Sequence, residues 1–440
     1  MPWDPLGVWP DERRWIWAAL ALWLAVFLGP GFVEQLSLGD WRSRPCLPDF
    51  AQEWSSARSY LSGLPIYGDL VASMQRFTGM HLDVSRNLIF INAHPPASVL
   101  LVLPLARLDF DTAFFVWNLL SLPLLALSVW MVGRSLRIPF RRWAIFPAAV
   151  LLLPCGSLHH QLYQGQLNLV LLPLLCGTWA AERSGRPRLA GVLLGAATAI
   201  KLFPAFLLAY YALRRRWAVV AAGVASASLL TGLTLALFGW QTHWTYFHTV
   251  LPEIYWFRVC WTNDSLAGFW YRLFDPAPWK ERIFSLSEPL WYSPALARAG
   301  YWTSAGLVSV FAAQVVSRSR SPQNDDRAFG LAVTTMLLVS PICWEHYLLL
   351  LLVPLAVCWR DIRPGQPAGW LFGLIVAGVW LDPRVVWILT GGECHVARPI
   401  ENLTVISYQF YALFGLFLLS VKMLRKFGDG APAGSLARAA

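Results

Sequence analysis

Long apolar runs separated by short clusters of Lys and Arg constrain the fold of this chain more than any other feature. Of its 440 residues, 57% are hydrophobic and only 14% are charged, whereas soluble domains carry about 25% charged residues. Runs such as 111–132, 218–238 and 403–424 match the roughly 20 apolar residues that a helix needs to cross a bilayer. The sequence therefore predicts an all-α, polytopic membrane protein, a single domain over residues 1–425 with about twelve transmembrane helices.

The charge pattern gives the expected topology. The formal net charge of +10 comes from Lys and Arg that lie mostly between apolar runs, as in cytoplasmic loops under the positive-inside rule, so no nucleic-acid partner is expected. The first apolar run is expected to be an uncleaved span with the N-terminus inside. The expected outer loops are residues 34–94, 239–299 and 382–402, and residues 428–440 are expected to form a disordered cytoplasmic tail.

One stretch conflicts with this topology. If every apolar run from 95 to 181 crosses the membrane, the basic segment 183–188 falls outside, against the charge rule. One of these short runs must therefore be re-entrant or too short to be a span.

Metal and disulfide chemistry have little support. The seven Cys form no C-x-x-C pair, and a disulfide between two of Cys46, Cys260 and Cys394 stays open. His159 and His160 are neighbours in the chain, so on a helix their side chains point about 100° apart, and no nearby carboxylate pair completes a site. We therefore expect no metal and no cofactor.

The first outer loop contains a helical pattern that begins at Asp49. Phe50, Trp54, Ala57 and Leu61 recur at helical spacing and give residues 49–61 one apolar face, which predicts an interfacial helix on the membrane surface. Because Asp is a favoured N-cap, the carboxylate has two interpretations: a cap of this helix, or the general base of a reaction.

A lysine interrupts the apolar run 189–213. The segment Lys201-Leu202-Phe203-Pro204 lies near its middle, and basic residues flank both ends of the run. Positive-inside logic favours a hairpin of two short helices with Lys201 at the outer apex; a single span would place Lys201 at mid-membrane. An intramembrane lysine is functional by default, although a snorkelling lysine that reaches the interface is the structural alternative.

Four polar clusters can meet at one membrane face: Asp49, residues 164–168, Lys201, and the break at residues 344–347. A carboxylate and cations beside the outer leaflet favour chemistry on a lipid-anchored phosphate. Asp49 would be the general base on an acceptor hydroxyl. Lys201 and His346 would stabilise the negative charge of the departing phosphate.

Several motifs occur in a characteristic order. They are Pro48-Asp49-Phe50, Gly63-Leu64-Pro65-Ile66-Tyr67, His94-Pro95-Pro96, Gly165-Gln166-Leu167-Asn168, Ala199-Ile200-Lys201-Leu202-Phe203-Pro204, and Ser340-Pro341 with Trp344-Glu345-His346-Tyr347. In this order and spacing the chain resembles glycosyltransferase family 87, the polyprenol-phosphate-mannose-dependent alpha-mannosyltransferases of the GT-C superfamily.

The resemblance implies a GT-C fold and an inverting, metal-independent transfer of a hexose, expected to be mannose, from a polyprenyl-phosphate donor to a lipid or glycan acceptor. It implies a bacterial inner-membrane protein with its site facing the periplasm or exterior, in contact with membrane lipids. The implied site residues are Asp49 and His346 as catalytic groups, Lys201, Gln166 and Asn168 at the donor phosphate, and Tyr67, His94, Trp344 and Glu345 lining the acceptor side or the pocket. Glu345 is expected to orient the His346 imidazole.

Two other functions compete with this one. In a transporter or flippase for a lipid-linked saccharide, Lys201 would escort phosphate and Asp49 would be only a cap. A polymerase or ligase would use lipid-diphosphate donors and Arg-rich outer loops, but Arg is scattered in the outer loops of this chain.

Overall fold

The structure is a computed structural model that describes residues 14–36, 47–80, 91–138, 145–276, 287–319, 321–362, 366–390 and 396–428. Within these ranges every regular element is a helix, and the β-bridges are isolated pairs, Asn263 with Trp344 and Ser287 with Ala397. The predicted all-α class is therefore confirmed for the described residues. Most of the predicted disordered tail, residues 429–440, lies outside them.

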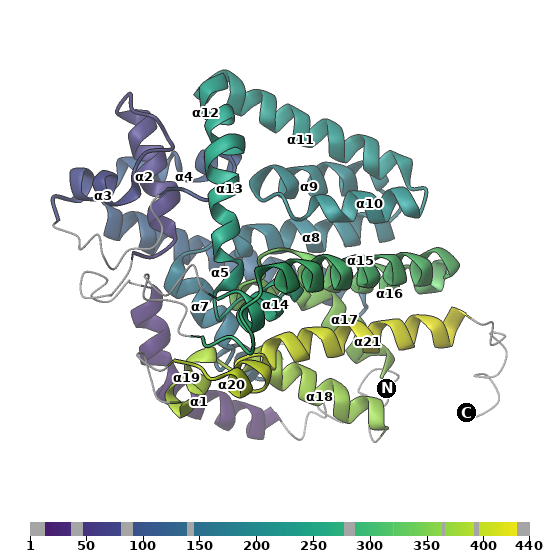
Figure 1. Cartoon of the computed structure of the whole chain (residues 1–440). Helices are drawn as coiled ribbons and strands as arrows, with labels where there is room; N and C mark the ends of the chain where they lie inside the picture. The colour runs from purple at the N-terminus through teal and green to yellow at the C-terminus, as the bar shows by residue number, and fades with distance from the viewer. Residues whose placement is uncertain are drawn as a thin grey trace.

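Long and short helices alternate along the chain (Figure 1). The long helices are α1 (Arg14–Leu36), α5 (Phe110–Ser135), α11 (Trp217–Phe238), α15 (Pro294–Arg318) and α21 (Tyr408–Gly428). Those of intermediate length are α2 (Phe50–Leu61), α8 (Asn168–Arg183), α9 (Pro187–Ile200), α16 (Asp325–Val339), α17 (Leu352–Asp361) and α18 (Pro367–Trp380). The short elements are α3 (Leu70–Thr78), α4 (Pro96–Val102), η4 (Leu105–Arg107), α6 (Ile145–Leu152), α7 (Gly156–Gln164), α10 (Ala205–Leu213), α12 (Trp240–Thr245), η6 (Tyr246–Val250), α13 (Leu251–Ile254), η7 (Tyr255–Val259), α14 (Leu266–Phe274), η9 (Pro322–Asn324), η10 (Glu345–Leu351), α19 (Pro383–Thr390) and α20 (Pro399–Leu403).

The number of spans is smaller than the sequence predicted. Among the described residues, five helices are long and apolar enough to cross a membrane, or seven if the bent pairs α6–α7 and α18–α19 each count as one span. This supports a multi-pass membrane protein but does not confirm about twelve spans. Several of the predicted spans are short helices: α8, α9 and α16 have 16, 14 and 15 residues.

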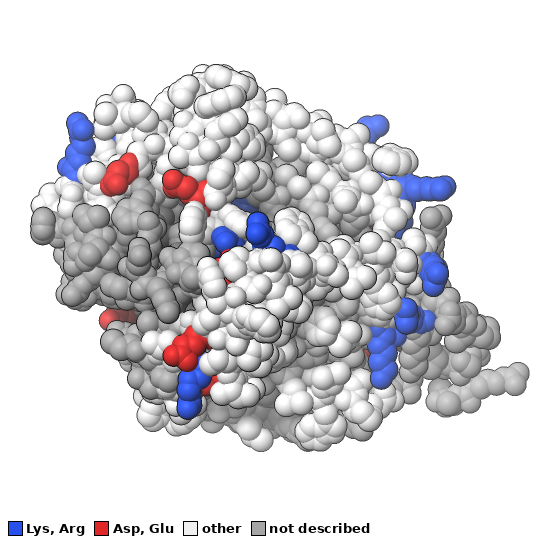
Figure 2. Space-filling view, in the orientation of Figure 1, with Lys and Arg blue, Asp and Glu red and all other residues white. Residues whose placement is uncertain are grey.

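Ion pairs join the basic loops at one end of the helices. Asp326, at the start of α16, accepts hydrogen bonds from Arg183 at the end of α8 and from Arg360 of α17. Arg216, before α11, contacts Asp325 at 3.1 Å and Glu182 at 3.2 Å. Lys and Arg side chains gather at this end, on the right in Figure 2.

This common basic end resolves the conflict over residues 183–188. The segment lies with the other basic loops, as the charge rule requires. The apolar runs before it are the ones that are not simple spans, since α4 has only 7 residues and α6 and α7 are bent by 74° at a short break.

The polar segments of interest lie at the other end of three helices. α8 runs from Asn168 to the basic end, α9 runs from the basic end to Ile200, and α16 runs from the basic end to Val339. Residues 164–168, Lys201 and the break after Val339 are therefore brought to the same end of the helices. Because α9 rises about 1.5 Å per residue, its 14 residues place Lys201 well away from the arginine loops.

Lys201 lies at the turn of a helical hairpin. α9 ends at Ile200, α10 begins at Ala205, and the contact between Arg216 and Glu182 shows that the chain has returned to the basic end. The structure thus supports the hairpin rather than a single span through residues 189–213.

The α2 helix is present, but its surroundings differ from the prediction. Its predicted bounds are confirmed, yet both its apolar and polar sides are buried: Trp54 is 1% exposed, and Gln52 and Glu53 are each 2% exposed. Its polar side chains face residues 92–94 instead of water. The structure therefore does not confirm a helix that lies on the membrane surface by one apolar face.

Glycines set the position of α9 against α11. A Cβ at Gly195 would lie 2.2 Å from the carbonyl oxygen of Gly223, and one at Gly191 would lie 2.3 Å from that of Val219. Small residues at this spacing allow two helix backbones to approach closely. The contact fixes the helix whose C-terminal end carries Lys201.

We predict that Gly195→Val separates α9 from α11 and destabilises the protein by about 1–3 kcal/mol, because the backbone of α11 cannot move aside locally. Thermal unfolding in detergent measures the effect. Gly232→Ala on α11, where no atom lies within 4 Å, is the matched control and should leave the midpoint unchanged or slightly raised. Equal midpoints for both variants would contradict the close contact.

Candidate active site

Asp49 occupies the N-cap position of α2 but does not cap it. Its side chain accepts no hydrogen bond from a backbone N–H of the first turn of the helix. Instead its carboxylate accepts from the side chains of Gln52 at 3.1 Å and Gln166 at 2.5 Å, and its backbone N–H donates to Gln164. The interpretation of Asp49 as a simple cap is therefore wrong, and its carboxylate faces the polar segment after α7.

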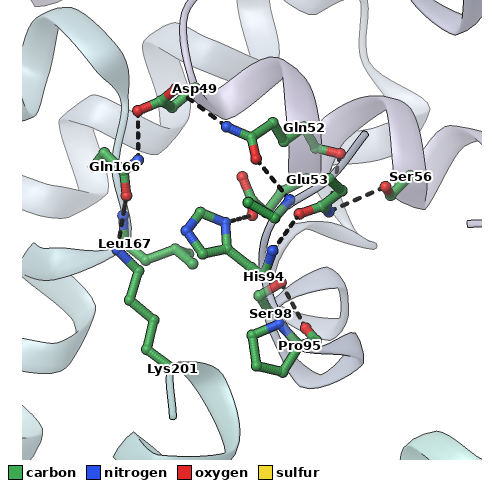
Figure 3. A network of polar contacts seen from close by, with 12 residues as sticks. Asp49, Gln52, Glu53, Ser56, His94, Pro95, Ser98, Gln166, Leu167 and Lys201 are labelled. Carbon is green, nitrogen blue, oxygen red and sulfur yellow. Dashed lines mark hydrogen bonds and ion pairs between the residues drawn. The ribbon is translucent and has the colours of Figure 1, made fainter. Parts of the chain in front are cut away.

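One amide joins this carboxylate to the lysine. Gln166 donates to Asp49 through Nε2 and accepts from the Lys201 ammonium through Oε1 at 2.9 Å (Figure 3). Gly165 makes this possible: its φ of +63° is left-handed, and a Cβ there would lie 2.8 Å from Phe50 and Phe114. The turn after α7 thus holds Gln166 between the two charges.

Lys201 is buried among acceptors. Besides Gln166, its Nζ donates to Asn168 at 3.4 Å and to the Tyr347 hydroxyl at 3.2 Å, and it lies 4.4 Å from the centre of the Tyr347 ring. Its residue exposure is 3%. The snorkelling alternative is therefore wrong, because the ammonium is held inside the protein by oxygen atoms and an aromatic face.

A second buried pair lies beside Asp49. Glu53 contacts Nδ1 of His94 through Oε1, and the Tyr67 hydroxyl donates to the His94 carbonyl at 2.7 Å. Gln52 fixes the same segment of the chain by accepting from the Ala93 N–H at 2.9 Å. The structure thus places Tyr67 and His94 against α2. Sequence analysis missed Glu53, although it follows Asp49 by one helical turn.

The electrostatics of Asp49 follow from these neighbours. Burial raises the pKa of Asp49, while the hydrogen bond from Gln166 and the charge of His94 lower it and the charge of Glu53 raises it. The net pKa lies above the ordinary value, which suits a group that must take up a proton.

The polar break before α17 packs against the loop between α13 and α14, part of the predicted second outer loop. Asn263 donates to the Pro341 carbonyl at 3.0 Å and accepts from the Cys343 N–H at 2.9 Å. Cys260, in the same loop, is buried with a free thiol, while Cys46 and Cys394 lie outside the described residues. The break reaches the site because Asn168 donates to the His346 carbonyl at 3.4 Å.

Glu345 has a different partner from the one expected. Its Oε1 contacts Nδ1 of His160 on α7 instead of orienting His346 directly, because η10 and α7 pack together. His346 in turn lies 3.4 Å from His160, Nδ1 to Nδ1. The half-buried Trp344 ring is nearly parallel to that of His346, with centroids 6.4 Å apart.

One ring nitrogen of the buried His346 has no hydrogen-bond partner among the described residues. Burial holds its pKa well below the ordinary value, and the charges of His160 and Lys201 lower it further. Its Nε2 is buried and has no hydrogen-bond partner among the described residues, and the same is true of Glu345 Oε2. Such orphaned polar atoms in a protein interior call for an explanation.

His160, Glu345 and His346 are all of residue types that can ligate a metal. One ligand atom from each of His160, Glu345 and His346 lies within 4.8 Å of the others. The sequence offered no carboxylate pair near His159 and His160; the structure brings one carboxylate, that of Glu345, to His160, because residues distant in the chain are adjacent in space. The absence of a metal remains an expectation.

The predicted site residues thus fall into two adjoining groups. Asp49, Gln166, Asn168 and Lys201 form one hydrogen-bonded chain, which Tyr347 extends. His346, Glu345 and Trp344 lie at its η10 side, and Tyr67 and His94 at its α2 side. The side chains that sequence analysis missed are Gln52, Glu53, His160 and Tyr347.

At one end of this multi-pass helical protein, the Asp49 carboxylate and the buried Lys201 side chain share the Gln166 amide, an arrangement of acid and base that fits a membrane enzyme. Residues 92–341 match the sequence model of glycosyltransferase family 87. The match covers more than half of the chain, so the chain belongs to this family. Asp49 lies before the matched range and His346 just after it. Membership in a glycosyltransferase family removes the support for a transporter or flippase and for a polymerase or ligase.

Curated relatives cover most of the chain. It is 28% identical over 357 residues to a polyprenol-phosphate-mannose-dependent alpha-(1-2)-phosphatidylinositol mannoside mannosyltransferase of Mycobacterium tuberculosis, covering 76% of this chain and 74% of the relative. A Mycolicibacterium smegmatis protein with the same description is 27% identical, with 75% and 72% covered. A pentamannoside mannosyltransferase from that species is 25% identical, with 76% and 68% covered.

Proposed function

We propose that this protein transfers mannose from a polyprenyl-phosphate donor to a lipid-anchored glycan, with inversion at the anomeric carbon. The observation that carries the proposal is the Asp49–Gln166–Lys201 chain, which holds a base and a cation at a fixed separation. The donor and the phosphatidylinositol mannoside class of acceptor are those named for the mycobacterial relatives.

Asp49 would be the general base. As the acceptor hydroxyl forms a bond to the anomeric carbon, its proton passes to the carboxylate, and the bond from that carbon to the phosphate oxygen breaks. The phosphate leaves as an anion, so no second carboxylic acid is needed. Attack from the face opposite the phosphate gives inversion.

Lys201 and His346 would bind the phosphate. The ammonium is held by uncharged oxygens of Gln166, Asn168 and Tyr347, so its charge is not cancelled by a directly bonded carboxylate. Charges placed in advance where a phosphate develops negative charge stabilise the transition state without reorganisation. Asn168 supports both groups, because it contacts Lys201 and the His346 carbonyl.

The site would face the exterior of a bacterial plasma membrane, with residues 1–425 acting as one domain. This orientation is supported by the basic loops at the opposite end of α8, α9 and α16. Elements from the first outer loop, the α9–α10 hairpin and the break before α17 all contribute side chains, which supports a single functional unit.

Asp49→Asn should leave the fold intact and lower transfer from polyprenyl-phosphate mannose by about 10²–10⁴-fold, because the amide cannot accept the proton. The assay uses purified protein in detergent with radiolabelled donor and a phosphatidylinositol mannoside acceptor. Asp69→Asn is the control, since Asp69 caps α3 through a hydrogen bond from Ala72 N–H and lies outside the site. Full activity of Asp49→Asn would remove the general-base mechanism.

The acid limb of kcat/KM should lie above the ordinary aspartate pKa, because the base must be ionised and burial raises the pKa of Asp49. Gln166→Leu removes a hydrogen bond that lowers this pKa, so the limb should move to higher pH. The measurement is the pH profile of wild type and variant. A limb that stays in place or moves to lower pH would show that Asp49 is not the titrating base.

Lys201→Met should raise the KM for the donor by at least about tenfold, as expected from the loss of a hydrogen bond to a charged group, with the acceptor KM unchanged. Lys422→Met, an exposed position on α21, is the matched control. An unchanged donor KM, or an equal rise in both constants, would contradict a role at the phosphate.

A further inference from the structure

His160, which is outside the motifs of the sequence, contacts His346 and its neighbour Glu345. His160 belongs to α7, and its Nδ1 faces two groups of η10: the Glu345 carboxylate, which it contacts, and Nδ1 of His346 at 3.4 Å. Glu345 and His346 are 1% and 2% exposed, so water does not compete at their side of these contacts. The proposed function assigns no role to His160.

The Glu345 contact determines which nitrogen of His160 carries hydrogen. An ionised carboxylate only accepts hydrogen bonds, so the His160 Nδ1 that contacts it must be protonated. Two Nδ1 atoms facing each other cannot both point a hydrogen along the line between them. Because the His160 Nδ1 that carries hydrogen has no lone pair in the ring plane, it cannot accept from His346, so the facing Nδ1 of His346 is the bare nitrogen and shares the one His160 N–H with Glu345.

The tautomer of His346 follows. A neutral imidazole that is bare at Nδ1 carries its hydrogen on Nε2. That is the atom which is buried without a partner among the described residues. The adjacent residue, Tyr347, contacts Lys201, and Asn168 contacts both Lys201 and the His346 backbone. His346 is thus linked, through the next residue and through its own carbonyl, to the residues that surround the Lys201 ammonium.

We propose that His160, held by Glu345, is a positioning residue that fixes His346 as the Nε2–H tautomer, so that its free N–H donates to a phosphate oxygen of the polyprenyl-phosphate. The inference rests on the proposed function for the identity of the ligand. The Glu345–His160 contact would then support binding of the polyprenyl-phosphate. The unpaired Nε2–H of His346 would be the group that donates to the phosphate.

The test measures the dissociation constant of polyprenyl phosphate, the leaving group, with the full-length protein in detergent. His160→Phe and His346→Phe should each weaken binding by at least about tenfold, the size expected for a hydrogen bond to a charged group. The KM for the acceptor should stay unchanged. His160→Gln keeps an N–H donor for Glu345 and should retain more affinity than His160→Phe.

A double variant separates positioning from general destabilisation. If His160 acts only through His346, the His160→Phe/His346→Phe protein should bind no more weakly than His346→Phe alone. His159→Gln is the matched control on the same helix, because His159 bonds to Gln35 and Leu153 and not to the site, and it should leave polyprenyl-phosphate affinity unchanged. If His160→Phe does not fold, Glu345→Gln replaces it and should show the same loss and the same non-additivity.

Three outcomes would overturn the inference. They are unchanged affinity in His160→Phe, additive losses in the double variant, and a stoichiometric metal ion, measured by mass spectrometry, that purifies with wild type and is lost from His160→Phe. The last would make the three side chains a metal site. Failure of wild type to bind polyprenyl phosphate at all would instead contradict the proposed function.

Discussion

The burial of one ammonium group organises the candidate site. Lys201 lies at the turn between α9 and α10, where a charge removed from water is costly unless oxygen atoms replace its hydration. Gln166, Asn168 and Tyr347 supply those oxygens from two other segments. Satisfying this charge brings the end of α7, the start of α8 and the break before α17 to the α9–α10 turn, and Gln166 then extends the contact to Asp49.

The helix directions make this convergence possible. α8, α9 and α16 each have one end among the arginine loops and the other end near Lys201. At the basic end, Asp325 and Asp326 bind arginines from several loops, which fixes the helices relative to one another. The glycines where α9 meets α11 set how closely the backbones of these two helices approach. The end with the arginine–aspartate ion pairs therefore acts as the structural anchor, and the opposite end, where Asp49 and Lys201 are joined through Gln166, is left for chemistry.

Much of the candidate site could be predicted because its residue types are unusual in apolar surroundings. Asp49, Lys201 and the polar pairs near Gln166 and His346 are polar interruptions in or beside apolar runs, so each was visible without a structure. Glu345 was also identified, but with the wrong partner, because its true partner His160 is distant in the chain and belongs to a helix whose packing no local pattern reveals. Glu53 was missed because charged residues in an expected surface helix are ordinary.

The sequence by itself determined the all-α class and the bounds of α2, and it favoured the hairpin around Lys201 and the gathering of the basic loops at one end, because helical periodicity and charge flanking are local properties of the chain. Only the tertiary structure decided that α2 is buried on both sides, that Asp49 does not cap it, and that Gln166 stands between two charges. These outcomes depend on which distant segments meet, since a buried polar group takes whichever partner the packing brings within hydrogen-bond distance.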